Sequence, residues 1–167
     1  MFHSIKEFSE TWKQHSEATK KVLASLTDQS LSQKVGPEDR TLGRMTWHIV
    51  TAIPEMMGRV GLKLNGPAAE SPLPKKAAEM LKGYDVLAKS LQEQVEKDWR
   101  DDTLQIEDDM YGSKWKRGLT LRILIDHEIH HRGQMTVLMR QAGLKVPGIY
   151  GPSREEWVKY GMPAPKI

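Results

Sequence analysis

The sequence predicts an all-α protein, an antiparallel four-helix bundle with a long crossover loop between its second and third helices. Apolar residues recur every three or four positions in four stretches of about 20 residues, which places them on one helical face. The chain has 9 Met but only 2 Phe, and flexible Met suits irregular helix packing better than a sheet. Its 167 residues are enough for one domain, residues 1–167, around a single core.

The limits of the helices follow from the apolar spacing and from the Gly and Pro residues that interrupt it. Pro54 inside the second helix removes a backbone donor, so we expect a kink there. Gly143 stands where a C-terminal cap of the fourth helix is expected. The four predicted helices cover residues 2–26, 41–62, 75–99 and 119–141.

The segments between and after these helices are less regular. Leu104 and Ile106 alternate with polar residues before a turn at residues 111–113, which predicts a short hairpin. The C-terminal segment, residues 143–167, is rich in Pro and Gly. Within it, Ser153 and Glu156 have capping-box spacing, which predicts one short terminal helix.

Composition excludes several classes of function. The chain has no Cys, which excludes a disulfide framework, a thiolate-bound metal, an iron-sulfur cluster and a cysteine nucleophile. Its net charge of +3 is spread over a mixed surface, so a nucleic-acid partner is not expected. Because there is neither a long apolar run nor a signal-peptide pattern, we expect a cytoplasmic protein without membrane contact.

Three histidines occupy positions that we expect to face the bundle. His127 and His131 lie one turn apart on the apolar face of the fourth helix, and His48 lies on the apolar face of the second. A single inward histidine is more often a hydrogen-bonded core residue, and a one-turn pair alone is only moderately specific. Three buried imidazoles together favour a shared divalent cation with an open coordination position, as in catalytic sites. Zn(II) and Ni(II) are the first candidates, although three nitrogens do not select the ion.

Two nearby side chains are candidates for supporting roles. Glu55 lies two turns after His48 and is our first candidate for an acid that reaches metal-bound water, with a solvated carboxylate as the alternative. Gln134 lies three residues after His131 and is expected to orient that ligand, to bind a metal-bound water, or to bond between helices. Gly133 predicts the close approach of another helix, with a glycine that the helix merely tolerates as the alternative.

For three other polar residues the sequence supports only weaker predictions. His130 is expected beside the ligands, at an interface or in solvent. Arg132 points away from the ligand pair, toward Glu128 or the C-terminal segment. His15, on the first helix, is expected to be structural.

The string from His127 to His131 also matches H-E-x-x-H, the zinc-peptidase signature in which Glu128 would be the general base. Such peptidases need a further downstream ligand and usually an edge strand for an extended substrate. Glu155 and Glu156 lie at a tolerable separation for that ligand, but no strong strand precedes the motif. Glu128 lies four residues before Arg132, the spacing of a surface ion pair, so we disfavour the peptidase.

A longer pattern resembles the DinB/YfiT-like family of metal-dependent enzymes. The pattern is H-E-I-H-H-R-G-Q at 127–134, with M-R-Q-A-G at 139–143, V-P-G-I-Y-G at 146–151 and L-G-R-M-T-W-H-I at 42–49. The resemblance implies a four-helix bundle, commonly a homodimer, that binds a divalent metal through His48, His127 and His131. It also implies that some relatives are thiol-dependent S-transferases or isomerases that use bacillithiol or mycothiol.

We therefore expect a metal-dependent enzyme, most simply an S-transferase in which the metal activates a low-molecular-weight thiol or water toward a small-molecule substrate. A metal-dependent hydrolase and a non-catalytic metal-binding bundle are the alternatives. The activity is expected from the resemblance and not from the residues themselves.

Overall fold

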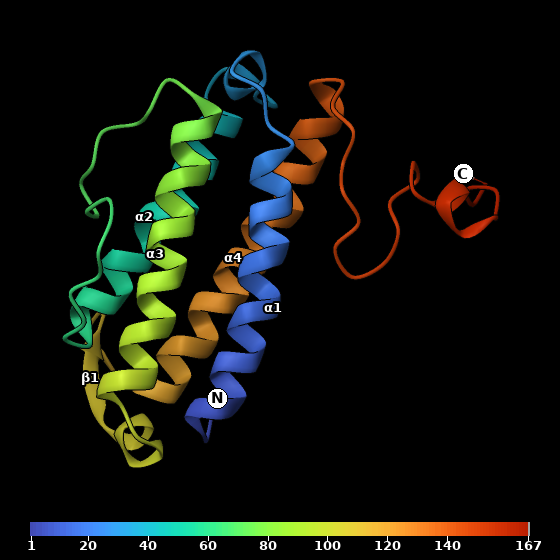
Figure 1. Ribbon diagram of the computed structural model, residues 1–167. Helices are drawn as coiled ribbons and strands as arrows, with labels where there is room; N and C mark the ends of the chain where they lie inside the picture. Colours follow the sequence, from blue (N-terminus) through green and yellow to red (C-terminus); the bar gives the residue numbers. More distant parts are fainter. Residues whose placement is uncertain (167) are drawn as a thin grey trace.

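The computed structural model describes residues 1–166 and confirms the all-α bundle (Figure 1). Every helix begins and ends within three residues of its predicted limits. The four α-helices of the described chain are α1 (Ile5–Ala24), α2 (Leu42–Arg59), α3 (Ala77–Asp98) and α4 (Arg117–Gln141).

The order of the helices around the bundle places α2 beside α4. Helices α1 and α2 each pack against both α3 and α4. Consecutive helices α1 and α2 run in opposite directions, as do α3 and α4, whereas the long crossover makes α2 and α3 run the same way (Figure 1). The second and fourth helices, which carry the three histidines, are therefore neighbours.

Local caps fix the ends of these two helices. Helix α2 begins where the Thr41 hydroxyl accepts a 3.1 Å hydrogen bond from the Arg44 N–H. Helix α4 ends before Gly143, which has a φ of +75°. The next N–H, that of Leu144, donates to the Met139 carbonyl at 2.9 Å, which completes the cap that the sequence predicted.

The core joins all four helices. The Trp12 indole is fully buried and donates to the Ala88 carbonyl at 3.0 Å, which ties α1 to α3. Pro54 lies inside α2, which continues through it, and the kink expected there stays a prediction. No helix within residues 1–166 is long and apolar enough to cross a membrane.

The crossover between α2 and α3 lies against the helices that it joins. The Trp47 indole donates to the Ser71 carbonyl at 2.8 Å. A Cβ at Gly83 would lie 3.0 Å from the Pro67 side chain, so a larger residue there would require the loop to shift by a few tenths of an ångström. The loop is thereby held beside α2, next to the site described below.

The predicted hairpin is present, a few residues later than the alternation suggested. Strands β1 (Glu107–Met110) and β2 (Ser113–Lys116) pair antiparallel. Leu104 is fully buried in a short 3₁₀ turn before them. The hairpin turns through Tyr111 and Gly112, both with positive φ, at 58° and 82°. This two-residue geometry matches the twist of the strands and holds Tyr111 at the tip.

In residues 143–166 the short terminal helix that the sequence predicted is a single 3₁₀ turn, Trp157–Tyr160. Half of the capping box is present, because the Ser153 N–H donates to the Glu156 carboxylate at 3.1 Å. Gly161, with a φ of +68°, ends the turn after four residues. The segment extends away from the bundle (Figure 1).

Candidate metal centre

Three imidazole rings meet at the seam between α2 and α4. The Nε2 atom of His127 lies 3.1 Å from Nε2 of His48 and 3.1 Å from Nε2 of His131. One ring nitrogen from each of the three lies within 4.8 Å of the others. The structure thus brings together the three histidines that the sequence singled out, from two separate helices.

The two short separations between these nitrogens fit a transition-metal ion. With metal–nitrogen bonds of about 2.0–2.1 Å, neighbouring ligands lie about 3.3 Å apart in a tetrahedron and about 3.0 Å apart in an octahedron. The two contacts of 3.1 Å fall between these values. Three imidazoles leave at least one further coordination position in either geometry.

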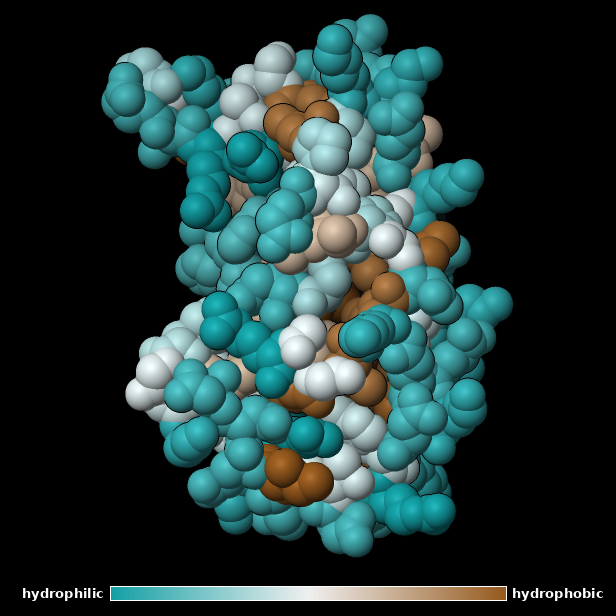
Figure 2. All heavy atoms as spheres, turned by 90° about the vertical axis from the view of Figure 1, so that its left-hand side faces the viewer, coloured by the Kyte–Doolittle hydropathy of each residue, from teal (hydrophilic) through white to brown (hydrophobic). Residues whose placement is uncertain are grey.

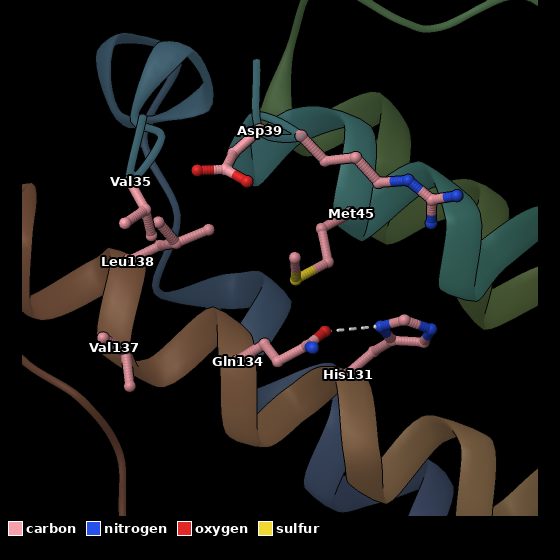
Figure 3. A pocket seen from close by; sticks show the side chains of 8 residues that line it. Val35, Asp39, Met45, His131, Gln134, Val137 and Leu138 are labelled. Carbon is pink, nitrogen blue, oxygen red and sulfur yellow. Dashed lines mark hydrogen bonds between the residues drawn. The ribbon is translucent and has the colours of Figure 1, made fainter. Parts of the chain in front are cut away.

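The hydrogen bonding of His131 directs a lone pair toward the cluster. Its Nδ1 lies 2.8 Å from the Gln134 amide oxygen, which can only accept, so Nδ1 carries the ring proton (Figure 3). Nε2 of the neutral ring is therefore a lone pair. His127 Nε2 holds at most one proton, so its contacts with His48 and His131 cannot both be full hydrogen bonds. A cation, in contrast, accepts all three lone pairs.

Burial keeps these rings neutral, which is the form that binds metal. Desolvation, together with smaller contributions from the neighbouring His131 and His48, lowers the pKa of His127 to about 4. Burial also lowers the pKa of His48 and of His131, the latter against the opposing effect of its bond to Gln134. At neutral pH all three nitrogens are available to a cation.

The sequence led us to expect the cluster in the centre of the bundle. It lies instead at the edge of the bundle. His48 and His127 are half-buried, and His131 is 9% exposed. The central positions of α4 are occupied instead by fully buried residues such as Leu124 and Glu128. Because other elements cover α4 on more than one side, its apolar face is broader than the stripe that carries the histidines.

A cavity of about 520 Å³ opens on the His131 side of the cluster. His131 and Gln134 form its floor on α4, and Met45 faces them from α2 (Figure 3). The Asp39 carboxylate points away from His131 (Figure 3). The remaining lining residues are Val35, Arg40, Val137 and Leu138.

A second cavity, of about 500 Å³, opens on the side of His48 and His127. It lies toward the crossover and the hairpin, on a face where apolar side chains form patches in a mostly hydrophilic surface (Figure 2). Thr51, Met56 and Ile123 are among its lining residues.

Glu55 and Tyr111 also line this second cavity. Glu55 Oε1 accepts from Arg59 at 2.7 Å and its Oε2 accepts from the Tyr111 hydroxyl, so both carboxylate oxygens are engaged. Burial and the bond to Glu55 raise the pKa of Tyr111 to about 12. Glu55 lines the same cavity as His48, and its reach to a metal-bound water stays a prediction. Sequence reasoning missed Tyr111, for which the only signal was the predicted turn.

Glu128 does not take part in the candidate centre. Its side chain is fully buried and accepts hydrogen bonds from the Thr19 hydroxyl at 2.8 Å and the Tyr84 hydroxyl at 2.9 Å. Burial raises its pKa to about 7. The predicted surface ion pair with Arg132 is wrong, because both side chains are buried and the Thr19 hydroxyl lies between them. The peptidase arrangement is therefore absent from the described chain.

Arg132 reaches the C-terminal segment, which was one of the two alternatives predicted for its side chain. It donates to the Tyr150 hydroxyl at 2.6 Å and to the His15 carbonyl at 2.8 Å. The Tyr150 hydroxyl also lies 3.1 Å from His15 Nδ1. His15 is thus structural, as predicted.

The remaining predictions have mixed outcomes. His130 is exposed, with its ring 4.9 Å from that of His131. Gly133 has nothing within 4 Å of an added Cβ, so the predicted approach of another helix there is wrong. Glu155 pairs with Arg140, and Glu156 accepts from the Gly148 and Ser153 N–H groups, so neither is near the histidines as a further ligand.

Known proteins resemble this chain over nearly its whole length. The model of the DinB family matches residues 1–164. The uncharacterized protein YrdA of Bacillus subtilis (strain 168) is 43% identical over 167 residues, all of both chains. A crystal structure of a DinB-like protein from Bacillus cereus ATCC 10987 is 44% identical, with a TM-score of 0.86 over 90% of this chain and 100% of that one.

A more distant crystal structure supports the fold alone. It is that of YjoA, a DinB-like protein from Bacillus subtilis, at 19% identity and a TM-score of 0.67, covering 86% of this chain and 96% of that one. The family match and the 43% identity over the full length together show that the chain belongs to the DinB family.

Proposed function

We propose that this protein is a metal-dependent enzyme whose ion is held by His48, His127 and His131. The observation that carries the proposal is the convergence of three Nε2 atoms from α2 and α4, with two separations of 3.1 Å. Zn(II) and Ni(II) both accept three imidazole nitrogens, so the ion is left to experiment. When bound, such a cation lowers the pKa of a thiol or water in its open position.

The surrounding residues prepare the site for this role. Gln134 holds the His131 ring with its Nε2 lone pair toward the other two histidines. Cavities of about 520 and 500 Å³ on opposite sides of the cluster give two small molecules access to it. Tyr111 and the apolar residues of the second cavity are suited to a largely apolar substrate.

Within this class we propose thiol-dependent S-transfer. A low-molecular-weight thiol loses its proton to solvent, and its sulfur forms a bond to an electrophilic carbon of the second substrate. The bond from that carbon to its leaving group breaks, and the leaving group departs with the bonding electron pair. The thiol must come from outside, since the chain has no Cys. Hydrolysis is less well supported, because Glu55 has both oxygens engaged and Glu128 is buried away from the histidines.

Metal content and two assays test the proposal. The purified chain is loaded with Zn(II) or Ni(II), and its metal content is measured beside that of His131→Ala. His130→Ala is the matched control, because His130 is the adjacent exposed histidine. The Zn(II)-loaded and Ni(II)-loaded proteins are then assayed for conjugation of an electrophile with cysteine or glutathione, and for hydrolysis of generic esters.

The outcomes separate the three functions. We expect one ion per chain in the wild type and in His130→Ala, a large loss in His131→Ala, and conjugation that requires added thiol. Ester hydrolysis without thiol would favour the hydrolase. Bound metal with neither activity would favour the non-catalytic bundle. Equal metal content in the wild type and His131→Ala would overturn the site itself.

A further inference from the structure

The second cavity, beside His48 and His127, borders a third cavity that the proposed function does not use. The third cavity, of about 590 Å³, lies between the end of α2 and the crossover that follows it. Glu55 and Ala69 line both cavities, so the two cavities meet at these side chains. Whether a molecule beside the histidines can extend into the third cavity therefore depends on how firmly Glu55 is held.

Glu55 is held in place from both sides. The Tyr111 hydroxyl, on the side of the second cavity, donates to its Oε2. Arg59 Nε, on the side of the third cavity, donates to its Oε1 at 2.7 Å. The Arg59 guanidinium also lies 4.4 Å from the centre of the Tyr111 ring, which ties the outer two residues to each other. Glu55, Tyr111 and Arg59 thus form a partition between the two cavities, which we call the Glu55 partition.

The backbone at Tyr111 is further evidence that its side chain has a role. Its φ of 58° is unfavourable for an aromatic residue, and Asn or Gly is usual at this position of a two-residue hairpin turn. Neither of those shorter side chains would extend as far from the hairpin tip toward α2. The Tyr111 ring also packs against Trp115, with ring centres 5.8 Å apart. The strained position is therefore occupied by a residue that completes the partition.

The second cavity presents no free charge to a ligand. Glu55 is the one formally charged side chain among the described residues that line it, and both of its oxygens are engaged. The Thr51 hydroxyl is also engaged, because it donates to the Trp47 carbonyl at 2.9 Å. Met56 and other apolar side chains make up much of the remaining lining. Such a cavity suits an uncharged, apolar molecule.

We propose that the Glu55 partition determines specificity, because it limits the second substrate to a short, uncharged, apolar molecule that ends at Glu55 and does not enter the third cavity. This inference rests on the proposed function, since it names the class of molecule that reacts beside the histidines. Glu55 is then a specificity-determining residue and not an acid or base that acts on metal-bound water.

A series of primary alcohols of increasing length tests the partition without an enzyme assay. Alcohols from 1-butanol to 1-decanol are titrated into the metal-free, ¹⁵N-labelled protein, and binding is followed through the NMR shifts of the Thr51 and Ala69 amides. Each methylene group that leaves water should strengthen binding by about two- to fourfold. The chain length at which the affinity stops rising shows where the cavity ends.

Four substitutions separate the partition from other effects. Glu55→Ala removes the partition, whereas Glu55→Gln keeps the size of the side chain without its charge. Tyr111→Phe keeps the ring and removes the hydroxyl that holds Glu55. Gly58→Leu fills the third cavity, because Gly58 lines that cavity and an added Cβ there has no neighbour within 4 Å. Gly58→Leu is made alone and together with Glu55→Ala, and circular dichroism checks that each variant is folded.

We expect the affinity of the wild type to rise along the series and then to stop rising at one chain length. Glu55→Ala should lengthen this limit by about four methylene groups, roughly the 5.4 Å of one helical turn. Long alcohols should then also shift the amide of Leu64, which lines the third cavity. Tyr111→Phe should lengthen the limit less than Glu55→Ala does.

The controls have the opposite expectation. Glu55→Gln and Gly58→Leu alone should keep the limit of the wild type, and Gly58→Leu should restore that limit in the Glu55→Ala protein. An affinity of the wild type that rises as far as 1-decanol, the absence of any binding, or a limit that Glu55→Ala leaves unchanged would overturn the partition. A longer limit that Gly58→Leu does not reverse would overturn it as well, since the added length would not lie in the third cavity.

Failure of this inference is distinguishable from failure of the proposed function. The titrations use metal-free protein, so their result does not depend on the metal centre. The metal content of the wild type and His131→Ala decides the centre separately. Loss of the centre with the expected chain-length limits would overturn the proposed function and retain the partition as the end of a site for short apolar molecules.

Discussion

At the scale of single residues, the centre depends on how each imidazole is oriented. Among the three rings, only His131 has its outer nitrogen held by a protein group within the described chain, through Gln134. His127 Nδ1 is buried without such a partner. The orientation of the whole cluster therefore relies on one hydrogen bond.

The first prediction concerns that bond. Gln134→Leu removes the acceptor while keeping a side chain of similar size, so the affinity for Zn(II) should fall by about 10- to 100-fold, the usual effect of losing such a partner. Competition with a chromophoric chelator measures the affinity. Gln92→Leu, at a half-buried position of α3 where the amide donates to Glu96, should leave the affinity unchanged. Equal affinities for the Gln134 variant and the wild type would show that the bond does not orient His131.

The second prediction concerns Glu128. Glu128→Ala leaves the buried Tyr84 hydroxyl without its acceptor and the Thr19 hydroxyl with only the His15 carbonyl, so the free energy of unfolding should fall by about 2–3 kcal/mol. Glu128→Gln retains an acceptor oxygen and should lose less. Urea denaturation monitored by circular dichroism checks both. A loss below about 0.5 kcal/mol in the alanine variant would contradict a structural role for this carboxyl group.

Residue spacing revealed some of these roles and concealed others. His48, His127 and His131 could be predicted because helical periodicity alone puts them on adjacent faces. The spacing of Glu128 and Arg132 suggested a surface pair, because spacing does not show how much of α4 is covered. Tyr111 comes from a hairpin tip, whose position depends on tertiary packing.

At the scale of secondary structure, the two glycines of α4 have opposite surroundings, Gly118 in its first turn and Gly133 in its interior. An added Cβ at Gly118 would lie 2.3 Å from the Phe2 carbonyl oxygen, and the Phe2 N–H donates to the Gly118 carbonyl at 3.0 Å. At Gly133 the same Cβ would meet only open space. The first glycine is required by packing against the N-terminal segment, and the second is not.

A matched pair of substitutions tests this contrast. Gly133→Ala should stabilise the protein by up to about 1 kcal/mol, the difference in helix propensity. Gly118→Ala should destabilise it by about 1–3 kcal/mol, because backbone atoms must move. Thermal or urea denaturation gives the sign of the change in stability for each variant. Stabilisation by Gly118→Ala, or destabilisation by Gly133→Ala, would mean that the surroundings of these glycines are not as described.

The helices could be predicted more closely than the segments that join them. Periodic apolar residues and the cap at Gly143 gave the helix limits to within three residues. The terminal helix expected after Ser153 is only a 3₁₀ turn, because little in that segment packs against the bundle to stabilise a longer helix.

At the scale of the whole molecule, the C-terminal segment is joined to the bundle through few side chains. The Tyr150 hydroxyl bonds to Arg132 and His15, and Glu155 pairs with Arg140. Exposed apolar side chains follow, with Val158 77% and Met162 47% exposed. The contacts of Tyr150 and Glu155 are polar, whereas Leu144, Val146 and Ile149 of the same segment pack against the hydrophobic core.

The fourth prediction concerns this attachment. Tyr150→Phe removes the hydroxyl, so trypsin should cleave the native protein after Lys145 or Arg154 about fivefold faster, in line with a hydrogen bond of about 1 kcal/mol. Tyr160→Phe is the control, since that exposed tyrosine makes no hydrogen bond within the described residues. The melting temperature should be the same in both variants. Equal cleavage rates would show that Tyr150 does not hold the segment.

The arrangement of the bundle brings together α2 and α4, and with them the histidines that define the centre. X-ray absorption spectroscopy of the Zn(II)- or Ni(II)-loaded protein tests this claim most directly. Three imidazole nitrogens at about 2.0–2.1 Å from the ion are predicted, with at least one lost in each of His48→Ala, His127→Ala and His131→Ala. A loaded ion with no imidazole neighbours, or a spectrum that these substitutions leave unchanged, would contradict the account.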